Sequence, residues 1–253
     1  VVILSKCGHP DAMWNKRVNE KEMRKDLKKS LEELKTDYID IYMLHRDDPD
    51  TDVAVAVETF NAMHEEGNIG AFGASNWTHT RIEEANEYAY KHNLIPFSVS
   101  SPNFCLARQV EDPWGGGCVN ISGPENQEVR AWYEKNQMPV IAYASLGRGF
   151  FSGRMKSEYA DHASDYLDSF AMTGYACSDN FERLRRCEII AEKHGVTVAQ
   201  IAMNWIFSHP LNIFAIASMS KADRMKANRE ALLLQLSDEE IAYLDLETPE
   251  FCG

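Results

Sequence analysis

The sequence predicts an α/β protein in which parallel strands alternate with outer helices in a TIM-barrel arrangement. Three observations predict this class: short apolar runs recur along the chain, a helical pattern follows most of them, and polar residues follow the runs. Unalternated apolar runs are typical of strands covered on both faces, and regular alternation of strand and helix implies a parallel sheet. Barrels of this kind place their binding and catalytic groups at the carboxyl ends of the strands.

Apolar runs predict six strands, over 1–4, 38–44, 69–74, 95–99, 140–144 and 213–217. Helical spacing or capping signals predict helices beginning near 19, 53 and 80, two over 181–194 and 197–208, and one from 237. A complete (β/α)8 barrel has eight such units, so six of eight indicates an incomplete barrel. An open doubly wound sheet is the alternative, but no G-x-G-x-x-G follows the first strand.

Composition and charge argue against several classes of function. The net charge of -13 over 253 residues, without a basic run, argues against nucleic acid as a partner. No apolar run approaches the roughly 20 residues of a membrane-spanning helix. The six cysteines are scattered without a C-x-x-C pair, which is typical of reduced thiols. We expect one soluble, cytoplasmic domain over 1–253, and because the chain starts without methionine inside an apolar run, we expect residue 1 not to be the first residue made.

Four motifs occur in order at predicted strand ends. L-K-T-D-Y-I-D-I-Y-M-L-H fills 34–45, G-A-S-N-W fills 73–77, A-Y-A-S-L-G-R-G fills 142–149, and a Ser- and Lys/Arg-containing segment fills 218–228. Together they resemble the aldo-keto reductases, a family of NADPH-dependent carbonyl reductases with (β/α)8 barrels. The resemblance runs from Ile3 to Leu246. It implies an oxidoreductase that reduces aldehyde or ketone carbonyls by hydride transfer from NADPH.

The resemblance also implies roles for single residues. Lys6 matches the family's catalytic lysine, whose charge favours the ionised form of a proton-donating tyrosine, and His45 matches the histidine that orients the carbonyl. The expected cofactor-binding residues are Ser75, Asn76, Ser101, Tyr143, Ala144, Ser145, Leu146, Gly147, Arg148, Ser218, Ser220, Lys221, Arg224 and Asn228. Lys221 and Arg224 would meet the 2′-phosphate at a helix N-terminus, which favours NADPH over NADH.

Each assignment has a simpler structural alternative. The alternative for Lys6, Lys221 and Arg224 is a solvated surface charge, and for His45 it is a hydrogen-bonded core group. Asn76 has the side chain of a helix cap, and Tyr143 that of a core aromatic. The order of the four motifs along the chain is what favours the functional interpretation.

Two features depart from the family pattern. Ser101 stands where the family often has a glutamine that touches the nicotinamide amide. The family's first two strands, which carry an aspartate and the proton-donating tyrosine, have no counterpart before Val1. We therefore expect a chain truncated at its N-terminus, with little reductase activity of its own.

Two other functions stay open at this level. A non-catalytic, cofactor-binding or regulatory homologue would need neither the aspartate nor the tyrosine. A metal-dependent barrel hydrolase would use His45, Asp47 and Asp48, since two carboxylates beside an imidazole can hold a divalent cation. No H-x-H or H-E-x-x-H supports the metal site, so no metal is expected. The sequence identifies neither the carbonyl substrate nor the oligomeric state.

Overall fold

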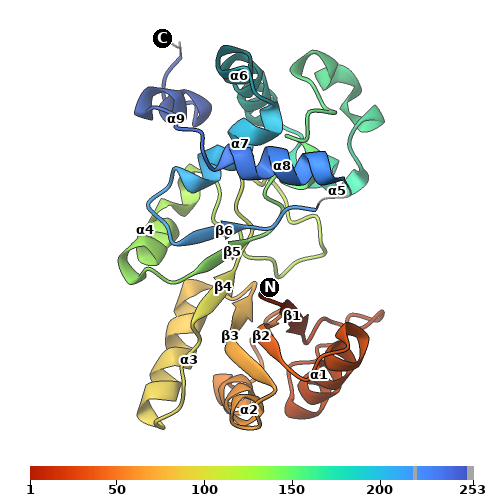
Figure 1. Cartoon of the computed structure of the whole chain (residues 1–253), viewed down its shortest axis with the longest axis vertical. Helices are drawn as coiled ribbons and strands as arrows, with labels where there is room; N and C mark the ends of the chain where they lie inside the picture. Colours follow the sequence, from red (N-terminus) through yellow and green to blue (C-terminus); the bar gives the residue numbers. More distant parts are fainter. Residues whose placement is uncertain (219–220, 250–253) are drawn as a thin grey trace. The chain divides into compact units, whose positions relative to one another are not determined.

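The structure is a computed structural model that describes residues 1–218 and 221–249 (Figure 1). The chain forms two compact units. Unit 1 consists of Val1–Pro102, Gly117–Val119 and Met138–Val140, and unit 2 consists of Asn103–Gly116, Asn120–Gln137 and Ile141–Gly253. The single domain expected over 1–253 stays a prediction.

Unit 1 alternates strands with helices, as Figure 1 shows. Its elements are β1 (Leu4–Cys7), α1 (Glu20–Leu34), β2 (Ile39–Leu44), α2 (Val53–Glu65), β3 (Ile69–Ser75), α3 (His79–Lys91) and β4 (Val99–Ser101). The strands are parallel, with Lys6 opposite Met43 and Ser75 opposite Ser101. The register therefore brings the carboxyl ends of the four strands to one edge of the sheet.

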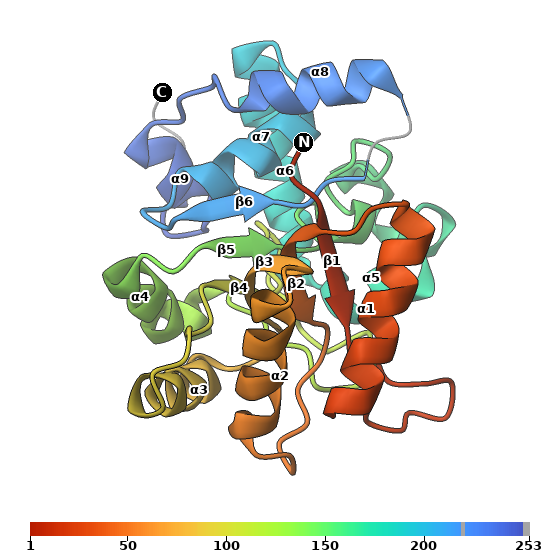
Figure 2. The same ribbon diagram turned by 60° about the horizontal axis from the view of Figure 1, so that its bottom comes forward.

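Unit 2 contains most of β5 (Val140–Ala142) and all of β6 (Ile213–Ala215). The Ile216 amide donates to the Ala142 carbonyl at 2.8 Å. Its helices are α4 (Gln127–Asn136), α5 (Ser169–Tyr175), α6 (Ser178–His194), α7 (Val198–Phe207), α8 (Ala222–Ala231) and α9 (Asp238–Leu244), with short 3-10 helices η1 (Pro124–Asn126), η2 (Gly147–Gly149) and η3 (Ser157–Asp165). Figure 2 shows α7 beside β6 and below α8.

The strands confirm the predicted fold class. Each strand is hydrogen-bonded to the next along the chain, in the order β1-β2-β3-β4-β5-β6. Over the described residues this order starts at β1 and stops at β6, which is six parallel strands in an α/β arrangement and fits an incomplete barrel. No helix in the described part of the chain has both the length and the apolar character needed to cross a membrane.

The core of unit 1 is aromatic. Phe60 of α2 stacks on Phe72 of β3 with ring centroids 5.3 Å apart, and Phe97 meets Phe60, Phe72 and Trp77. Beside this cluster, β3 and β4 approach closely at Gly73, where a Cβ would lie 1.9 Å from the Val99 carbonyl oxygen. The glycine of the G-A-S-N-W motif is therefore required by strand packing.

Two predicted strands are displaced. β1 begins at Leu4 instead of Val1, and Val1 and Val2 are exposed, so Lys6 lies inside the strand. The fourth strand is Val99–Ser101 instead of 95–99. The reason is that the amides of Ile95 and Phe97 donate to the side-chain oxygens of Asn61 and Asn86, both at 2.8 Å, so helix side chains replace ladder hydrogen bonds there.

Helix starts were predicted with mixed success. Asn19, Thr197 and Ser237 cap α1, α7 and α9, and the last two form capping boxes. The cap of α3 is Thr78, which accepts from the Arg81 amide, and not Thr80. Helices α4 and α5 were missed, and α4 buries only Tyr133 among its residues, so its apolar pattern is weak.

Candidate functional site

Lys6 is the centre of a polar cluster in unit 1. Its Nζ donates to the hydroxyl of Ser75 at 3.0 Å and to that of Ser101 at 3.1 Å, so three strand ends meet at one amine. Ser75 in turn donates to the Ser101 carbonyl at 2.7 Å. Burial, and after it the positive charge of Arg46, lower the pKa of Lys6 to about 8. Lys6 is therefore not the solvated surface charge of the simpler alternative.

His45 follows β2 and is partly buried beside Lys6. Burial first, and then the charges of Lys6, His9 and Arg46, lower the pKa of His45 to about 3. The imidazole is therefore neutral at physiological pH, with one nitrogen able to donate a hydrogen bond and the other able to accept one. Its ring meets the His9 ring edge-on, with centroids 4.6 Å apart.

Asn76 connects the polar cluster to a distant segment of the chain. It has a left-handed backbone with φ 61°, and its side-chain amide donates to the His45 carbonyl at 3.0 Å and to the Ser75 hydroxyl at 3.3 Å. Its side-chain oxygen accepts from the Val119 amide at 3.1 Å. Asn76 thus positions the end of β2 and the 117–119 segment, and it does not cap α3.

The carboxylates of the alternative metal site are paired with cations. Asp47 lies 3.5 Å from Arg81, and Asp48 lies 2.6 Å from Lys16. Within the ranges that the structure describes, no group of three or more His, Cys, Asp or Glu side chains could hold a metal ion. These ion pairs speak against a hydrolase centred on His45, Asp47 and Asp48.

Unit 2 contains a cavity of about 580 Å³ at the ends of β5 and β6. Its lining includes the predicted cofactor residues Ala144, Ser145, Leu146, Arg148, Ser218, Arg224 and Asn228. Thr197 and Ala199 at the start of α7, and Ala227 of α8, complete much of the wall. The sequence thus predicted a set of residues from separate segments that the fold brings together around one space.

The turn after β5 shapes this cavity. The Ser145 hydroxyl donates to the Ile216 carbonyl at 2.9 Å and to that of Ala142 at 3.2 Å, which joins the ends of β5 and β6. Ala144 and Arg148 both have φ near 52°, the left-handed region that non-glycine residues rarely adopt. The amide of Gly147 donates back to Ala144 at 2.7 Å, so that amide closes the turn and is not directed to a ligand.

The cations of unit 2 differ in their surroundings. Arg148 binds Asp168 through Nε, with both carboxylate oxygens 3.0 Å away, and its guanidinium lies over the Phe170 ring. Lys221 is the N-cap residue of α8, and Arg224 follows in the first turn, where both are exposed. Helix α8 is hydrogen-bonded to α7, because Gln200 and Asn204 of α7 donate to the carbonyls of Ala227 and Ala231.

Tyr143 and Ser220 are the two remaining predicted cofactor residues. Tyr143 is half-buried, and its ring meets Trp114 edge-on with centroids 5.6 Å apart. Ser220 lies outside the described residues.

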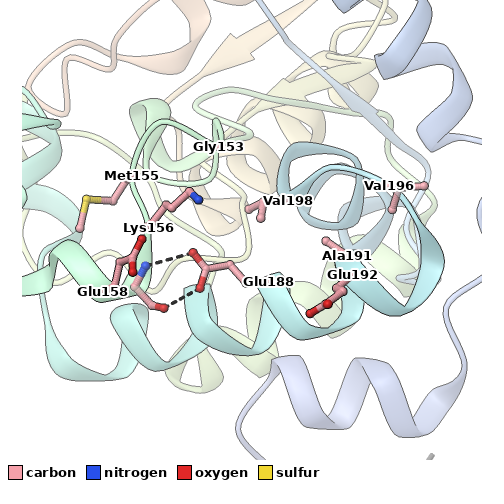
Figure 3. A pocket seen from close by; sticks show the side chains of 10 residues that line it. Gly153, Met155, Lys156, Glu158, Glu188, Ala191, Glu192, Val196 and Val198 are labelled. Atoms are coloured by element: carbon pink, nitrogen blue, oxygen red, sulfur yellow. Dashed lines mark hydrogen bonds between the residues drawn. The ribbon is translucent and has the colours of Figure 1, made fainter.

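A second cavity in unit 2, of about 430 Å³, has the wrong charge for a phosphate (Figure 3). Its wall carries the carboxylates of Glu158, Glu188 and Glu192 and one ammonium group, that of Lys156. Glu188 is held by Ser157, whose amide and hydroxyl both donate to it. Such a wall repels anions, so this cavity does not suit a phosphate group.

Comparison with known proteins gives the same family assignment as the sequence motifs. The sequence pattern described as the Aldo/keto reductase family matches residues 1–246. The chain belongs to the aldo/keto reductase family.

Three members of this family show how far the similarity extends. An aryl-alcohol dehydrogenase of Pestalotiopsis microspora is 24% identical over 95% of this chain and 57% of its own length. A putative voltage-gated potassium channel subunit beta of Schizosaccharomyces pombe is 22% identical over 92% of this chain and 62% of its own. A crystal structure of a thermostable aldo-keto reductase, Tm1743, with the inhibitor epalrestat has a TM-score of 0.68 at 22% identity, covering 97% of this chain and 71% of that one. The chain thus spans about three fifths of the length of these curated relatives.

The sequence did not point to two neighbours of Lys6. Arg46 is buried directly after His45, and its guanidinium donates to the thiol of Cys118. The D-Y-I-D-I-Y-M-L-H-R context placed Arg46 beside the predicted site, but no local signal marks Cys118, which comes from a Gly-rich loop over 70 residues away. Long-range contacts of this kind are not encoded by periodicity or capping.

Proposed function

We propose that this protein is an oxidoreductase that uses NADPH to reduce the carbonyl group of a small aldehyde or ketone. The observation that carries the proposal is the cavity of unit 2, whose wall is formed by residues from the 142–149 motif and the 218–228 segment. Its volume of about 580 Å³ lies within the range of roughly 300–1,000 Å³ that is usual for ligand sites.

The cavity suits the phosphate-bearing part of a dinucleotide. Ser218, Thr197 and Asn228 supply hydroxyl and amide groups to its wall, and Arg224 adds a positive charge at the start of α8. A helix N-terminus favours an anion, so helix and guanidinium act in the same direction. We assign Arg224, with Lys221 beside it, to the 2′-phosphate that distinguishes NADPH from NADH.

The polar cluster of unit 1 suits the carbonyl. A bound nicotinamide would supply the hydride. The neutral His45 imidazole can donate a hydrogen bond to the carbonyl oxygen, and the Lys6 ammonium stabilises the negative charge that develops there. Ser75, Asn76 and Ser101 hold Lys6 and the His45 backbone in place, so we assign them a positioning role in addition to the cofactor contact that the family resemblance implies.

A pair of cavity variants tests the proposal. Ala227 lines the cavity, whereas Ala222 of the same helix is exposed and does not line it. A227F should weaken NADPH binding at least about tenfold by filling the site, equivalent to about 1.4 kcal/mol. A222F should leave binding unchanged.

Binding is measured by titrating the chain into NADPH and following nucleotide fluorescence. The absence of any binding by the unaltered protein, or equal binding by A227F and A222F, would remove the basis for a nucleotide site in this cavity.

A further inference from the structure

The surroundings of Lys6 resemble those of a nucleophilic amine. Lysine becomes a nucleophile in proteins when it is desolvated or lies beside another cation, because both favour the neutral amine. Lys6 has both features: it is largely buried, and the Arg46 guanidinium and the partly buried His45 follow the adjacent strand β2. Its pKa of about 8 agrees with this geometry.

The neighbours of Lys6 also fix the direction of the amine. The hydroxyls of Ser75 on β3 and Ser101 on β4 accept from Nζ at 3.0 and 3.1 Å. The charged or titratable groups around it are Arg46 and His45 from the end of β2 and Cys118 from the 117–119 segment. Cys118 raises the pKa of Lys6, but burial and the Arg46 charge have larger effects and lower it. The Lys6 side chain keeps partial access to solvent.

We propose that Lys6 condenses with small aldehydes to form an imine, an activity that needs no nucleotide and goes beyond the reductase function. The neutral Nζ forms a bond to the carbonyl carbon, and one amine proton passes through solvent to the carbonyl oxygen to give a neutral carbinolamine. The hydroxyl group then takes a second proton from solvent and leaves as water while the nitrogen lone pair forms the C=N bond, and the nitrogen returns its last proton to solvent. The sum is amine plus aldehyde giving imine plus water, with no oxidation or reduction.

If small aldehydes form an imine at Lys6, they would inhibit the reductase activity for which they are the proposed class of substrate. At pH 7.5 a group with a pKa of about 8 is about one quarter neutral, against roughly 0.1% for an ordinary lysine with a pKa near 10.4. Lys16 provides the contrast within unit 1, since it lies 2.6 Å from Asp48 and 2.7 Å from Asp50 and these carboxylates raise its pKa. An imine at Lys6 would also remove the charge that we assign to carbonyl polarisation.

The test is reductive trapping on the full chain without cofactor. Benzaldehyde and sodium cyanoborohydride convert an imine into a stable benzylamine, and fragment-ion peptide mapping assigns each labelled site. We expect Lys6 to be labelled at least about tenfold more than the mean of the exposed lysines at pH 7.5, and Lys16 to be labelled least. K6R should lose this label, while K16R should leave labelling of Lys6 unchanged.

The pH profile gives a second readout that does not depend on any variant. Labelling of Lys6 should rise with a midpoint near pH 8, and R46M should move that midpoint upward because a repelling charge is removed. Labelling of Lys6 at or below the level of the exposed lysines, or a midpoint near pH 10, would overturn the proposal. Neither result bears on NADPH binding in unit 2, so the two proposals fail separately.

Discussion

Replacing Lys6 by methionine should stabilise the chain at neutral pH. The pKa of Lys6 is lowered from 10.5 to about 8, so at pH 7 the folded state holds a charge that the unfolded chain hydrates better. A shift of this size corresponds to about 3 kcal/mol of folding free energy. Loss of the hydrogen bonds to Ser75 and Ser101 offsets about 1 to 2 kcal/mol. We expect a net gain of about 1 to 2 kcal/mol for K6M.

The sign of the pH dependence is the sharper part of this prediction. Because the folded pKa lies below the unfolded value, the cost of the charge is fully present below about pH 8 and disappears as the pH rises toward 10.5. The stability difference should therefore move by about 2.5 kcal/mol against K6M between pH 7 and pH 10, so that K6M becomes the less stable protein at pH 10.

Urea unfolding of the wild type, K6M and K21M at both pH values measures this difference. Lys21 is exposed on α1, so K21M should stay within about 0.5 kcal/mol of wild type at each pH. A K6M variant that is less stable than wild type at pH 7, or whose stability difference is independent of pH, would show that Lys6 is not a desolvated cation.

Three other predictions concern stability and are measured by the same urea unfolding. G73A should cost about 3 kcal/mol, because the added Cβ would lie 1.9 Å from the Val99 carbonyl oxygen; a cost below about 1 kcal/mol would contradict the close strand approach. Because the pKa of His45 is lowered to about 3, the free energy of unfolding of the wild type should fall by about 1 kcal/mol between pH 8 and pH 5, after halving for solvent screening. H45Q should reduce that fall, and an identical fall in H45Q would contradict the lowered pKa. S237A should cost about 1 kcal/mol through the capping box of α9, and no measurable change would mean that the box contributes nothing.

The fold class was predictable because it depends on local patterns. The run 69–74 has no polar residue, and capping boxes at Thr197 and Ser237 mark helix starts through contacts three residues apart. The displaced fourth strand shows the limit of such patterns. Ile95 and Phe97 are apolar and strand-like, but Asn61 and Asn86 from helices take their amides, and this competition cannot be read from the run itself.

The candidate site was predictable where a family motif placed residues at strand ends. Lys6, Ser75 and Ser101 come from three strands, and the parallel register alone is sufficient to bring them together. The chemical state of Lys6 was not predictable, because it depends on burial and on Arg46. The geometry of the turn at Gly147 was not predictable either, since Ala144 and Arg148 both have a left-handed backbone and the Gly147 amide donates back to the Ala144 carbonyl.

We propose that the cavity beside α8 binds NADPH through Arg224. The most direct measurement is the ratio of NADH to NADPH dissociation constants for the wild type, R224M and R229M. Arg229 lies on the same helix and is also exposed, but it does not line the cavity. We predict that R224M lowers the ratio about tenfold, the equivalent of about 1.4 kcal/mol for one exposed charge-assisted contact, and that R229M leaves it unchanged. An equal ratio in all three proteins would contradict the claim.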